Sequence, residues 1–360
     1  MENKIGVGNL FSLFGQSITY GINRTNEALI KSFSLKRYVY LGWLFFLASL
    51  GQMGIPNFNS GSNNFGRSSQ SSAFFKESFD FIKDNVALVI VISIIIFIIF
   101  ISFMLLLKYI GARYRMVWLR TLLKAPFFES YDKSSIHLGN SLFVFELVVQ
   151  SIIIAILLIS SIPLIIYLIA LFPDISEILD SPGEEIIPVI ILLLFVIFFV
   201  VIPVSIIFSM INTLTNDFVI PVMDSKGMRC YETWKLLYPF FKANFWSLFL
   251  YIISIGFCMG ILNGLLSVLS FFIILPVGLF LAGFAILGWI IAGGWNPALL
   301  ILYIPLGLFL AVSVWFIILL FMLPAGALRR YISYDMITKM KPDLFDLNDS
   351  LLLPEDKDFS

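Results

Sequence analysis

The chain carries little charge. Of its 360 residues, 23 are Lys or Arg and 23 are Asp or Glu, so that charged residues make up 13% of the sequence. A soluble domain carries roughly 25%. A chain with so few charges cannot cover a water-facing surface with polar groups. The shortage of charge therefore excludes an ordinary soluble globular protein.

Several further absences exclude classes of function. The formal net charge is zero, so there is no basic field to attract nucleic acid and no nucleic-acid partner is expected. Cys230 and Cys258 give neither a disulfide framework nor zinc-ligand spacing, and His137 is the single histidine. The P-loop, H-E-x-x-H and G-x-S-x-G motifs are missing. We therefore expect no metal, no cofactor and no enzymatic activity.

What the chain has in abundance is apolar sequence. Hydrophobic residues make up 59% of it, and the mean hydropathy is +0.97. Several apolar runs exceed the roughly 20 residues that cross a bilayer as a helix. This pattern predicts an all-α, polytopic bundle of transmembrane helices. The expected spans are 37–55, 85–107, 142–172, 187–214 and 298–325, with one further apolar region at 244–294.

Residues 244–294 decide the number of crossings. Two full crossings there would place Arg329 and Arg330 outside the cell, against the rule that cytoplasmic loops are rich in Lys and Arg. Pro276 and nearby glycines favour a broken segment that enters the membrane only part-way, which is tolerated where protein covers it. We therefore expect six crossings plus a re-entrant element. Seven crossings is the alternative.

Charge also predicts orientation and domain organisation. Lys and Arg gather before residue 37, at 108–141 and at 214–243, and are missing from 173–186. This distribution places the N-terminus in the cytoplasm of a plasma-membrane protein. The expected units are listed here: an amphipathic N-terminal segment at 1–35, a transmembrane domain at 36–328 with a flexible Gly/Ser/Asn-rich extracytoplasmic loop at 56–84, and an acidic, disordered cytoplasmic tail at 329–360.

The N-terminal segment has an apolar stripe at helical spacing. The stripe includes Leu10, Phe14 and Ile18, while polar residues occupy the other side. Such a helix commonly lies on the membrane surface with its apolar face in the lipid. We expect this arrangement, with a partner-binding helix as the alternative.

A cationic and aromatic segment follows the second predicted span. Positive side chains alternate there with Tyr109, Tyr114 and Trp118. Cations bind anionic headgroups and aromatic rings prefer headgroup depth, so this pattern is typical of a cytoplasmic interface. The residues expected to contact anionic lipid headgroups are Lys108, Arg113, Arg115, Arg120 and Lys124.

Polar residues inside the predicted spans are candidate sites. Glu146 and Gln150 lie four residues apart and share one helix face. Glu146 could mark an ion or proton path, or it could form a structural pair with an arginine of the 113–120 segment. Ser209, Asn212, Asn216 and Asp217 could line a hydrophilic vestibule, or they could hydrogen-bond between helices. Asn263 needs a buried partner or a wet cavity.

Gly256, Gly260 and Gly264 recur every fourth residue. This spacing lines one helix face with no side chains, which allows a neighbouring helix to approach closely. We expect tight helix packing there.

Three segments of the sequence carry a resemblance. They are FSLKRYVYLGWLFFLASLG followed by the Gly/Ser/Asn-rich loop, GARYRMVWLR, and NDFVIPVM leading to ETWKLLYPFFKANFWSLFLYIIS. Together they resemble a family of uncharacterised prokaryotic multi-pass membrane proteins, best populated in archaea. The pattern is also distantly similar to membrane domains attached to glycerophosphodiester phosphodiesterases. The sequence shows no phosphodiesterase catalytic domain, so that activity is not implied, and the resemblance indicates architecture while leaving function open.

Within this layout, residues 216–234 are interpreted as a membrane exit. Pro221 is expected to break the helix, and Asp224 to Gly227 to form a turn. The leading functional hypothesis is a non-enzymatic membrane protein that interacts with lipids or with partner membrane proteins. The alternatives are a transporter or channel for a small solute or ion, and a membrane-embedded enzyme.

Overall fold

A computed structural model describes residues 7–31, 33–50, 86–123, 133–171, 186–291 and 297–345. Every regular element within these ranges is helical, which confirms the all-α prediction. The elements η1, η3 and η4 are π-helical and η5 is a 3₁₀ helix. In chain order they are α1 (Val7–Thr25), η1 (Asn26–Lys31), α2 (Leu35–Leu50), α4 (Val86–Leu123), α5 (Lys133–Leu171), α7 (Ile186–Val196), η3 (Ile197–Val201), α8 (Ile202–Leu214), η4 (Thr215–Val219), α9 (Ile220–Lys226), α10 (Cys230–Ala243), α11 (Phe245–Ile291), α12 (Pro297–Met340) and η5 (Pro342–Leu344).

Five helices in the described part of the chain are long and apolar enough to cross a membrane. They are Leu88–Leu123, Ile136–Pro163, Ile191–Lys226, Phe245–Phe272 and Val312–Met340. In the first and third of these, no residue of the most apolar 18-residue window is buried inside the protein. Apolar surface on this scale is stable only when hydrocarbon surrounds it. The chain is therefore a multi-pass membrane protein.

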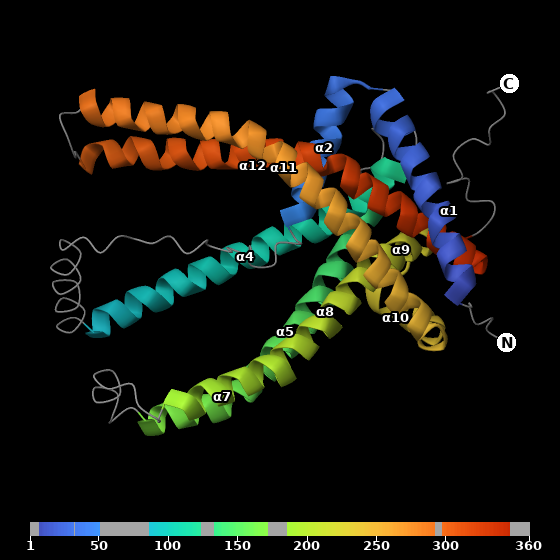
Figure 1. Cartoon of the computed structure of the whole chain (residues 1–360), viewed down its shortest axis with the longest axis horizontal. Coiled ribbons are helices and arrows are strands. Elements are labelled where there is room, and N and C mark those ends of the chain that lie inside the picture. Colours follow the sequence, from blue (N-terminus) through green and yellow to red (C-terminus); the bar gives the residue numbers. More distant parts are fainter. Residues whose placement is uncertain are drawn as a thin grey trace.

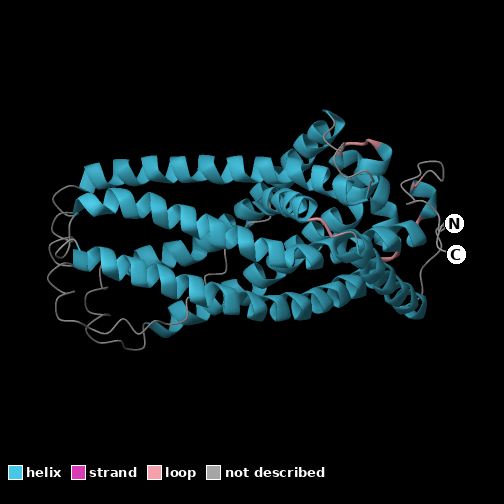
Figure 2. Ribbon diagram, turned by 90° about the horizontal axis from the view of Figure 1, so that it is seen from above, coloured by secondary structure: helices cyan, strands magenta, loops and turns pink. Residues whose placement is uncertain are grey.

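The long helices extend from one packed end of the molecule (Figure 1). The packed end consists of α1, α2, α9 and α10 together with the adjoining parts of α4, α5, α11 and α12. From it, α4 extends separately, α5 runs beside α7 and α8, and α11 runs beside α12. A second view shows the same long helices reaching the opposite end of the molecule (Figure 2). The described apolar side chains of α4, α5 and α8 are largely exposed, while the packed end holds the core.

The core forms where apolar side chains from several helices meet. Met116 and Leu119 of α4, Phe218 of η4 and Leu237 of α10 are all fully buried and belong to one cluster. Met116 and Leu119 lie three residues apart, so they share one face of α4. This buried face is the reason that α4 continues beyond the predicted end of its span at residue 107 as far as Leu123.

The N-terminal helix is amphipathic as predicted, and protein covers part of its apolar face. Leu10 and Phe14 are buried in the core cluster, and Phe14 packs edge-on against Tyr251 with ring centroids 6.0 Å apart. The Ser17 hydroxyl donates to Asp335 of α12 at 2.7 Å. A Cβ atom on Gly21 would lie 2.8 Å from Ile332, so the absence of a side chain allows α1 to approach α12 closely. Phe11 and Ile22 of the same helix are each 52% exposed, so contact of this remaining apolar surface with lipid stays a prediction.

The predicted re-entrant element is also corrected. Residues 245–291 form one continuous helix, α11, which includes Pro276. A proline removes one backbone hydrogen bond from a helix, and the long apolar sequence on both sides keeps α11 helical. The predicted first span, 37–55, corresponds to the 16-residue helix α2, which is not among the five candidate spans. Residues 51–55 lie outside the described part, so six crossings stays a prediction. The alternative of seven crossings is wrong, because residues 245–291 form a single helix.

The boundary of the predicted tail moves towards the C-terminus. The helix α12 continues through residues 329–340, which were expected to be disordered, because Tyr331, Ile332 and Met336 are buried in the packed end. The loop at 56–84, Lys124 and residues 346–360 of the tail lie outside the described residues.

Candidate functional site

A π-helical turn places two polar side chains in the middle of the packed end. The helix that begins at Ile186 continues to Lys226, and its Thr215–Val219 turn is π-helical. Such wider turns occur mostly as single insertions in α-helices, frequently at functional sites. Within this turn Asn216 is 5% exposed and Asp217 is fully buried. Pro221 follows at the start of α9 and continues the helix, so the prediction that it breaks the helix is wrong; the helix ends at Gly227, which has a φ of 64°.

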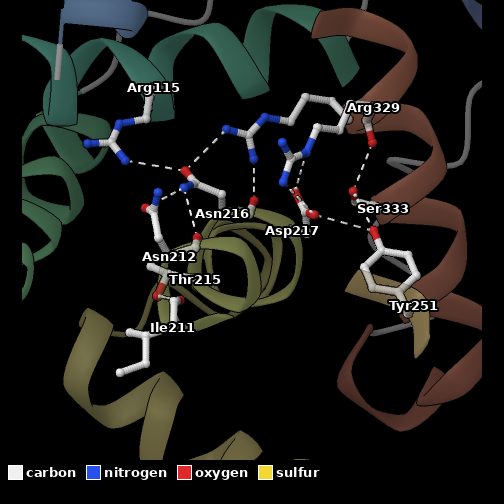
Figure 3. A network of polar contacts seen from close by, with 10 residues as sticks. Arg115, Ile211, Asn212, Thr215, Asn216, Asp217, Tyr251, Arg329 and Ser333 are labelled. Atoms are coloured by element: carbon white, nitrogen blue, oxygen red, sulfur yellow. Dashed lines mark hydrogen bonds and ion pairs between the residues drawn. The ribbon is translucent and has the colours of Figure 1, made fainter. Parts of the chain in front are cut away.

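Asp217 is held by two helices that are distant in the sequence. Nε of Arg329 donates to one carboxylate oxygen at 3.1 Å, and a terminal nitrogen of Arg329 donates to the other at 3.0 Å. The Tyr251 hydroxyl of α11 also donates to Asp217, at 3.4 Å. It forms a second hydrogen bond, of 3.0 Å, with the Ser333 hydroxyl. Figure 3 shows Asp217 pointing from its turn towards Arg329, with Tyr251 and Ser333 beside it. Asp217 therefore joins the 186–226 helix to α11 and α12.

Asn216 connects α4 and α12 on the other side of the turn. Its side-chain oxygen accepts from Arg115 at 3.2 Å, and its amide nitrogen donates to the backbone and side-chain oxygens of Asn212, each at 2.9 Å (Figure 3). Arg330 donates to the backbone oxygen of Asn216 and reaches its side-chain oxygen at 3.5 Å. The amide thus lies between two guanidinium groups.

Glu146 pairs with Arg115 through both of its carboxylate oxygens, and the second contact measures 2.7 Å. The Arg115 side chain is 1% exposed and that of Glu146 14% exposed. This bidentate geometry is the strong form of a charge-assisted hydrogen bond. The sequence-based hypothesis that Glu146 reaches an arginine of the 113–120 segment agrees with this contact. Gln150, one helical turn further along α5, accepts a hydrogen bond from Lys108.

The cations expected to contact lipid headgroups point mainly into the protein. Arg115 binds Glu146, and Arg120, 8% exposed, binds Asp224. Arg113 donates to Asn140 at 2.8 Å and lies over the Tyr109 ring at 4.1 Å. The prediction is therefore corrected for Arg115 and Arg120, because protein carboxylates bind these two guanidinium groups in the interior.

A cavity of about 270 Å³ adjoins this network. Residues of α2, α4, the 186–226 helix and α12 line it. Three arginines are among the described lining residues, and no carboxylate is. The described residues that line it are Phe45, Ala48, Ser49, Arg115, Trp118, Ser209, Asn212, Thr213, Asn216, Gly326, Arg329 and Arg330.

Other predicted sites remain apart from this cavity. Asn263 is exposed on α11 and does not line it. A Cβ atom on Gly256, Gly260 or Gly264 would meet no atom within 4 Å, so nothing in the described chain packs on these glycines. The expectation of tight packing there is therefore wrong for the single chain, because α11 turns this face outward.

The outer face of α10 forms a second polar and aromatic surface. Cys230, Leu237 and Phe240 point inward and are buried. On the opposite side Tyr231 is 72% exposed and Tyr238 is 60% exposed. Lys235 and Lys242 are exposed on this side too.

Several residues of the site were not identified as site residues from the sequence, among them Tyr251, Ser333 and three residues that line the cavity. Arg329 and Arg330 served only as markers of membrane side, and Trp118 was interpreted as a headgroup-level ring. The signal that could have found the arginines is their position directly after the small residues of LPAGAL at the end of an apolar run. Cations continuing a helix after small residues can lie against neighbouring helices.

The chemistry available in the network is binding of charge. Among the described residues, no group of three or more His, Cys, Asp or Glu side chains could hold a metal ion. Both carboxylates nearest the cavity accept hydrogen bonds from arginines, Glu146 from Arg115 and Asp217 from Arg329. The cavity wall itself supplies mostly N–H donors.

One comparison with known proteins gives a match. A family model described as a family of unknown function (DUF7544) matches residues 16–347, which is nearly the whole chain. No curated protein sequence and no solved structure matches it.

Proposed function

We propose that this chain, which belongs to the DUF7544 family of unknown function, is a non-catalytic membrane protein that binds anionic lipids at one face of the bilayer. One observation carries this proposal: the outer face of α10 combines exposed aromatic rings with exposed lysines. Aromatic rings prefer headgroup depth, and each Lys near an anionic membrane surface contributes about 1 kcal/mol of binding free energy.

The position of α10 supports contact with headgroups. Asn244 adopts a non-helical conformation (φ −114°, ψ 28°) and separates α10 from the candidate span that begins at Phe245. Exposed apolar side chains start at once, with Trp246 72% exposed and Ile253 52% exposed. Because these side chains need hydrocarbon around them, α10 lies at the level where the lipid-facing surface begins.

We further propose that the packed end faces the cytoplasm of a plasma membrane. The cation-rich segments at 108–123 and 214–243 meet at this end, and the positive-inside rule places such segments on the cytoplasmic side. The helix α1 packs against the C-terminal part of α12 at the same end. This orientation gives the lysines of α10 access to the anionic cytoplasmic leaflet.

The pairing of two carboxylates with arginines supports a non-catalytic role. A general base must have a free carboxylate within reach of its substrate. Arginine guanidinium groups bind both Glu146 and Asp217. The enzyme hypothesis is therefore the weakest of the three.

The transporter hypothesis has one supporting observation, the cavity beside Asn212. Transport through the polar residues named from the sequence would require them to share a water-filled path. Glu146, Gln150 and Asn263 are not among the described residues that line the cavity. Lipid binding also accounts for the exposed aromatic rings and lysines on the outer face of α10.

The test measures headgroup selectivity. The K235Q/K242Q double variant removes both lysines from the outer face of α10. The ratio of phosphatidylglycerol to phosphatidylcholine retained by the purified protein, counted by native mass spectrometry, should fall by about an order of magnitude. Replacing Arg115 or Arg120 would not test this, because these side chains take part in internal ion pairs.

The control is K31Q, which removes one exposed lysine from η1 and should leave the ratio close to that of the wild type. An unchanged ratio in the double variant would contradict the proposal.

A further inference from the structure

The cavity wall contains buried donors without an acceptor. Nε of Arg115 and Nε1 of Trp118 have no hydrogen-bond partner in the described part of the protein, and both residues line the cavity. Arg115 is 1% exposed and Trp118 is 2% exposed. Each of these nitrogens can only donate. Buried donors in folded proteins nearly always have an acceptor, so two such donors beside one cavity point to a ligand that accepts hydrogen bonds.

The same wall carries an excess of positive charge. Arg115 and Arg329 each pair with a carboxylate, whereas Arg330 has none among the described residues. Arg330 is 6% exposed. In the described part of the chain its guanidinium donates to the oxygens of Asn216 and lies near the ring of Trp118, with its Cζ 5.8 Å from the ring centroid. The charge of Asp217 also acts on Arg330, but Asp217 is already paired with Arg329. A buried charge is stable when an opposite charge or strong hydrogen bonds compensate it. The ligand that fits this wall is therefore an anion.

Three separate features bring the residues that carry these donors to one cavity. Arg115 and Trp118 lie three residues apart on α4 and thus share a helix face. Arg330 reaches the Trp118 ring from α12. All three residues line the same cavity.

One side of the cavity reaches the surface beside lipid. Ser209 and Asn212 line it and are exposed. They lie within two turns after Ile206 and Ile207 of α8, which are 54% and 59% exposed and need hydrocarbon around them. The opening therefore lies where the apolar surface ends, which is the depth of lipid phosphates.

We propose that this cavity binds one phosphate group, which is either part of a lipid headgroup or free in solution. Arg330 supplies the compensating charge, and the Arg115 Nε–H and Trp118 Nε1–H groups donate hydrogen bonds to phosphate oxygens. Planar guanidinium groups match the geometry of phosphate well. A volume of about 270 Å³ lies just below the range of about 300–1,000 Å³ that is usual for drug-sized ligands, as expected for a single small group. This site goes beyond the surface binding by α10 and depends on different residues.

The sharpest variant is W118F, which removes the donor and keeps an aromatic ring under Arg330. W43F is the matched control, because Trp43 is 48% exposed and does not line the cavity. The full-length protein in neutral detergent is titrated with inorganic phosphate in one series and with short-chain phosphatidylglycerol in another. Ionic strength is held constant with gluconate, and the dissociation constant is obtained from the shift in Tm.

At least one of the two compounds should bind to the wild type and to W43F, and W118F should weaken that binding about tenfold, which is the effect of losing one charge-assisted hydrogen bond. Binding of phosphatidylglycerol alone would identify a lipid headgroup, and binding of inorganic phosphate would identify a soluble phosphate compound. R330Q should weaken the same binding further.

Two results would overturn the proposal. One is that neither compound shifts the Tm of the wild type. The other is that W118F and W43F bind with equal affinity. The K235Q/K242Q variant should bind phosphate as the wild type does, so a failure of this proposal is distinguishable from a failure of the one for α10.

Discussion

The guanidinium of Arg329 binds both carboxylate oxygens of Asp217, at 3.1 and 3.0 Å, and so connects α12 with the π-helical turn η4. The two residues are 112 positions apart in the sequence. Asp217 is fully buried, whereas the Arg329 side chain is 36% exposed. The pair lies in the packed end, where the 186–226 helix, α11 and α12 meet.

Replacing Asp217 with Asn should destabilise the protein. The change leaves Arg329 without its charge partner and removes a negative charge that also acts on Arg330. Breaking a buried pair costs about 3–5 kcal/mol, and the partial exposure of Arg329 puts this case at the lower end, near 3 kcal/mol. The free energy of unfolding from denaturant titration in detergent measures it. E27Q is the control, because the Arg24–Glu27 pair is on the surface, and it should cost less than about 1 kcal/mol.

Glu146 is predicted to matter because it compensates a buried arginine. In E146Q, Arg115 would keep only neutral acceptors, and stability should fall by about 3 kcal/mol or more. The double variant R115M/E146L removes both charges of this pair and should be more stable than E146Q alone, because Arg115 no longer leaves a buried charge without its carboxylate. A double variant as unstable as E146Q would contradict a compensating role. The midpoint of thermal unfolding compares the three proteins.

Two glycines should respond in opposite directions to replacement by alanine. A Cβ on Gly139 would lie 2.6 Å from the backbone Cα of Arg113, so G139A must push α4 and α5 apart and should cost about 1–3 kcal/mol. A Cβ on Gly260 meets nothing within 4 Å. G260A should therefore leave stability unchanged or raise it by up to about 1 kcal/mol through helix propensity. Thermal unfolding of both variants checks the difference, and a destabilised G260A would indicate a partner on that face.

Cys230 should be unreactive in the folded protein. Burial raises the pKa of the Cys230 thiol far above its ordinary value, so the thiol stays protonated, and only the thiolate reacts with maleimide. Because the unfolded thiol ionises near pH 8.5, its burial contributes stability fully below that pH, and this contribution is lost as pH rises towards the folded pKa.

Maleimide labelling in a C258A background measures this reactivity. Labelling of Cys230 should require denaturant at pH 7 and at pH 9. The variant C230A/Y231C/C258A, whose new thiol replaces a side chain that is 72% exposed, should be labelled within minutes. Fast labelling of Cys230 itself would show that α10 detaches from the core.

The long apolar helices could be predicted from the sequence because hydrocarbon imposes one simple requirement on them. Their ends could not, because the packed end decides them. The segment that begins at Lys108 was assigned to the headgroups by its cations, yet Met116 and Leu119 bury one of its faces and extend α4 to Leu123. The number of Lys and Arg residues in a segment indicates that the segment lies outside the hydrocarbon. It does not indicate whether other helices pack against it.

The contacts of the candidate site could be predicted only where the sequence indicates which helices lie next to each other. The pairing of Glu146 with an arginine of the 113–120 segment could be inferred because the two helices follow each other in the chain. Asp217 with Arg329 could not, because the sequence does not fix which distant helix faces the turn. The π-helical geometry of that turn also has no clear sequence signal.

Regular spacing alone was insufficient at Gly256, Gly260 and Gly264. A face without side chains allows close packing, but it does not require a partner, and α11 turns this face away from the rest of the chain. By contrast, Gly21 and Gly139 lie against neighbouring helices without belonging to any repeated pattern.

The apolar part of α4 has a mechanical consequence. Between Leu88 and Leu106 none of its side chains is buried, while its other end is fixed by Arg115 and the residues around it. A helix held at one end only can lean to match the thickness of the surrounding bilayer, at a cost of fractions of a kcal/mol per Å. The protein can thus pass between thin and thick membranes by adjusting this inclination, without disturbing a single ion pair.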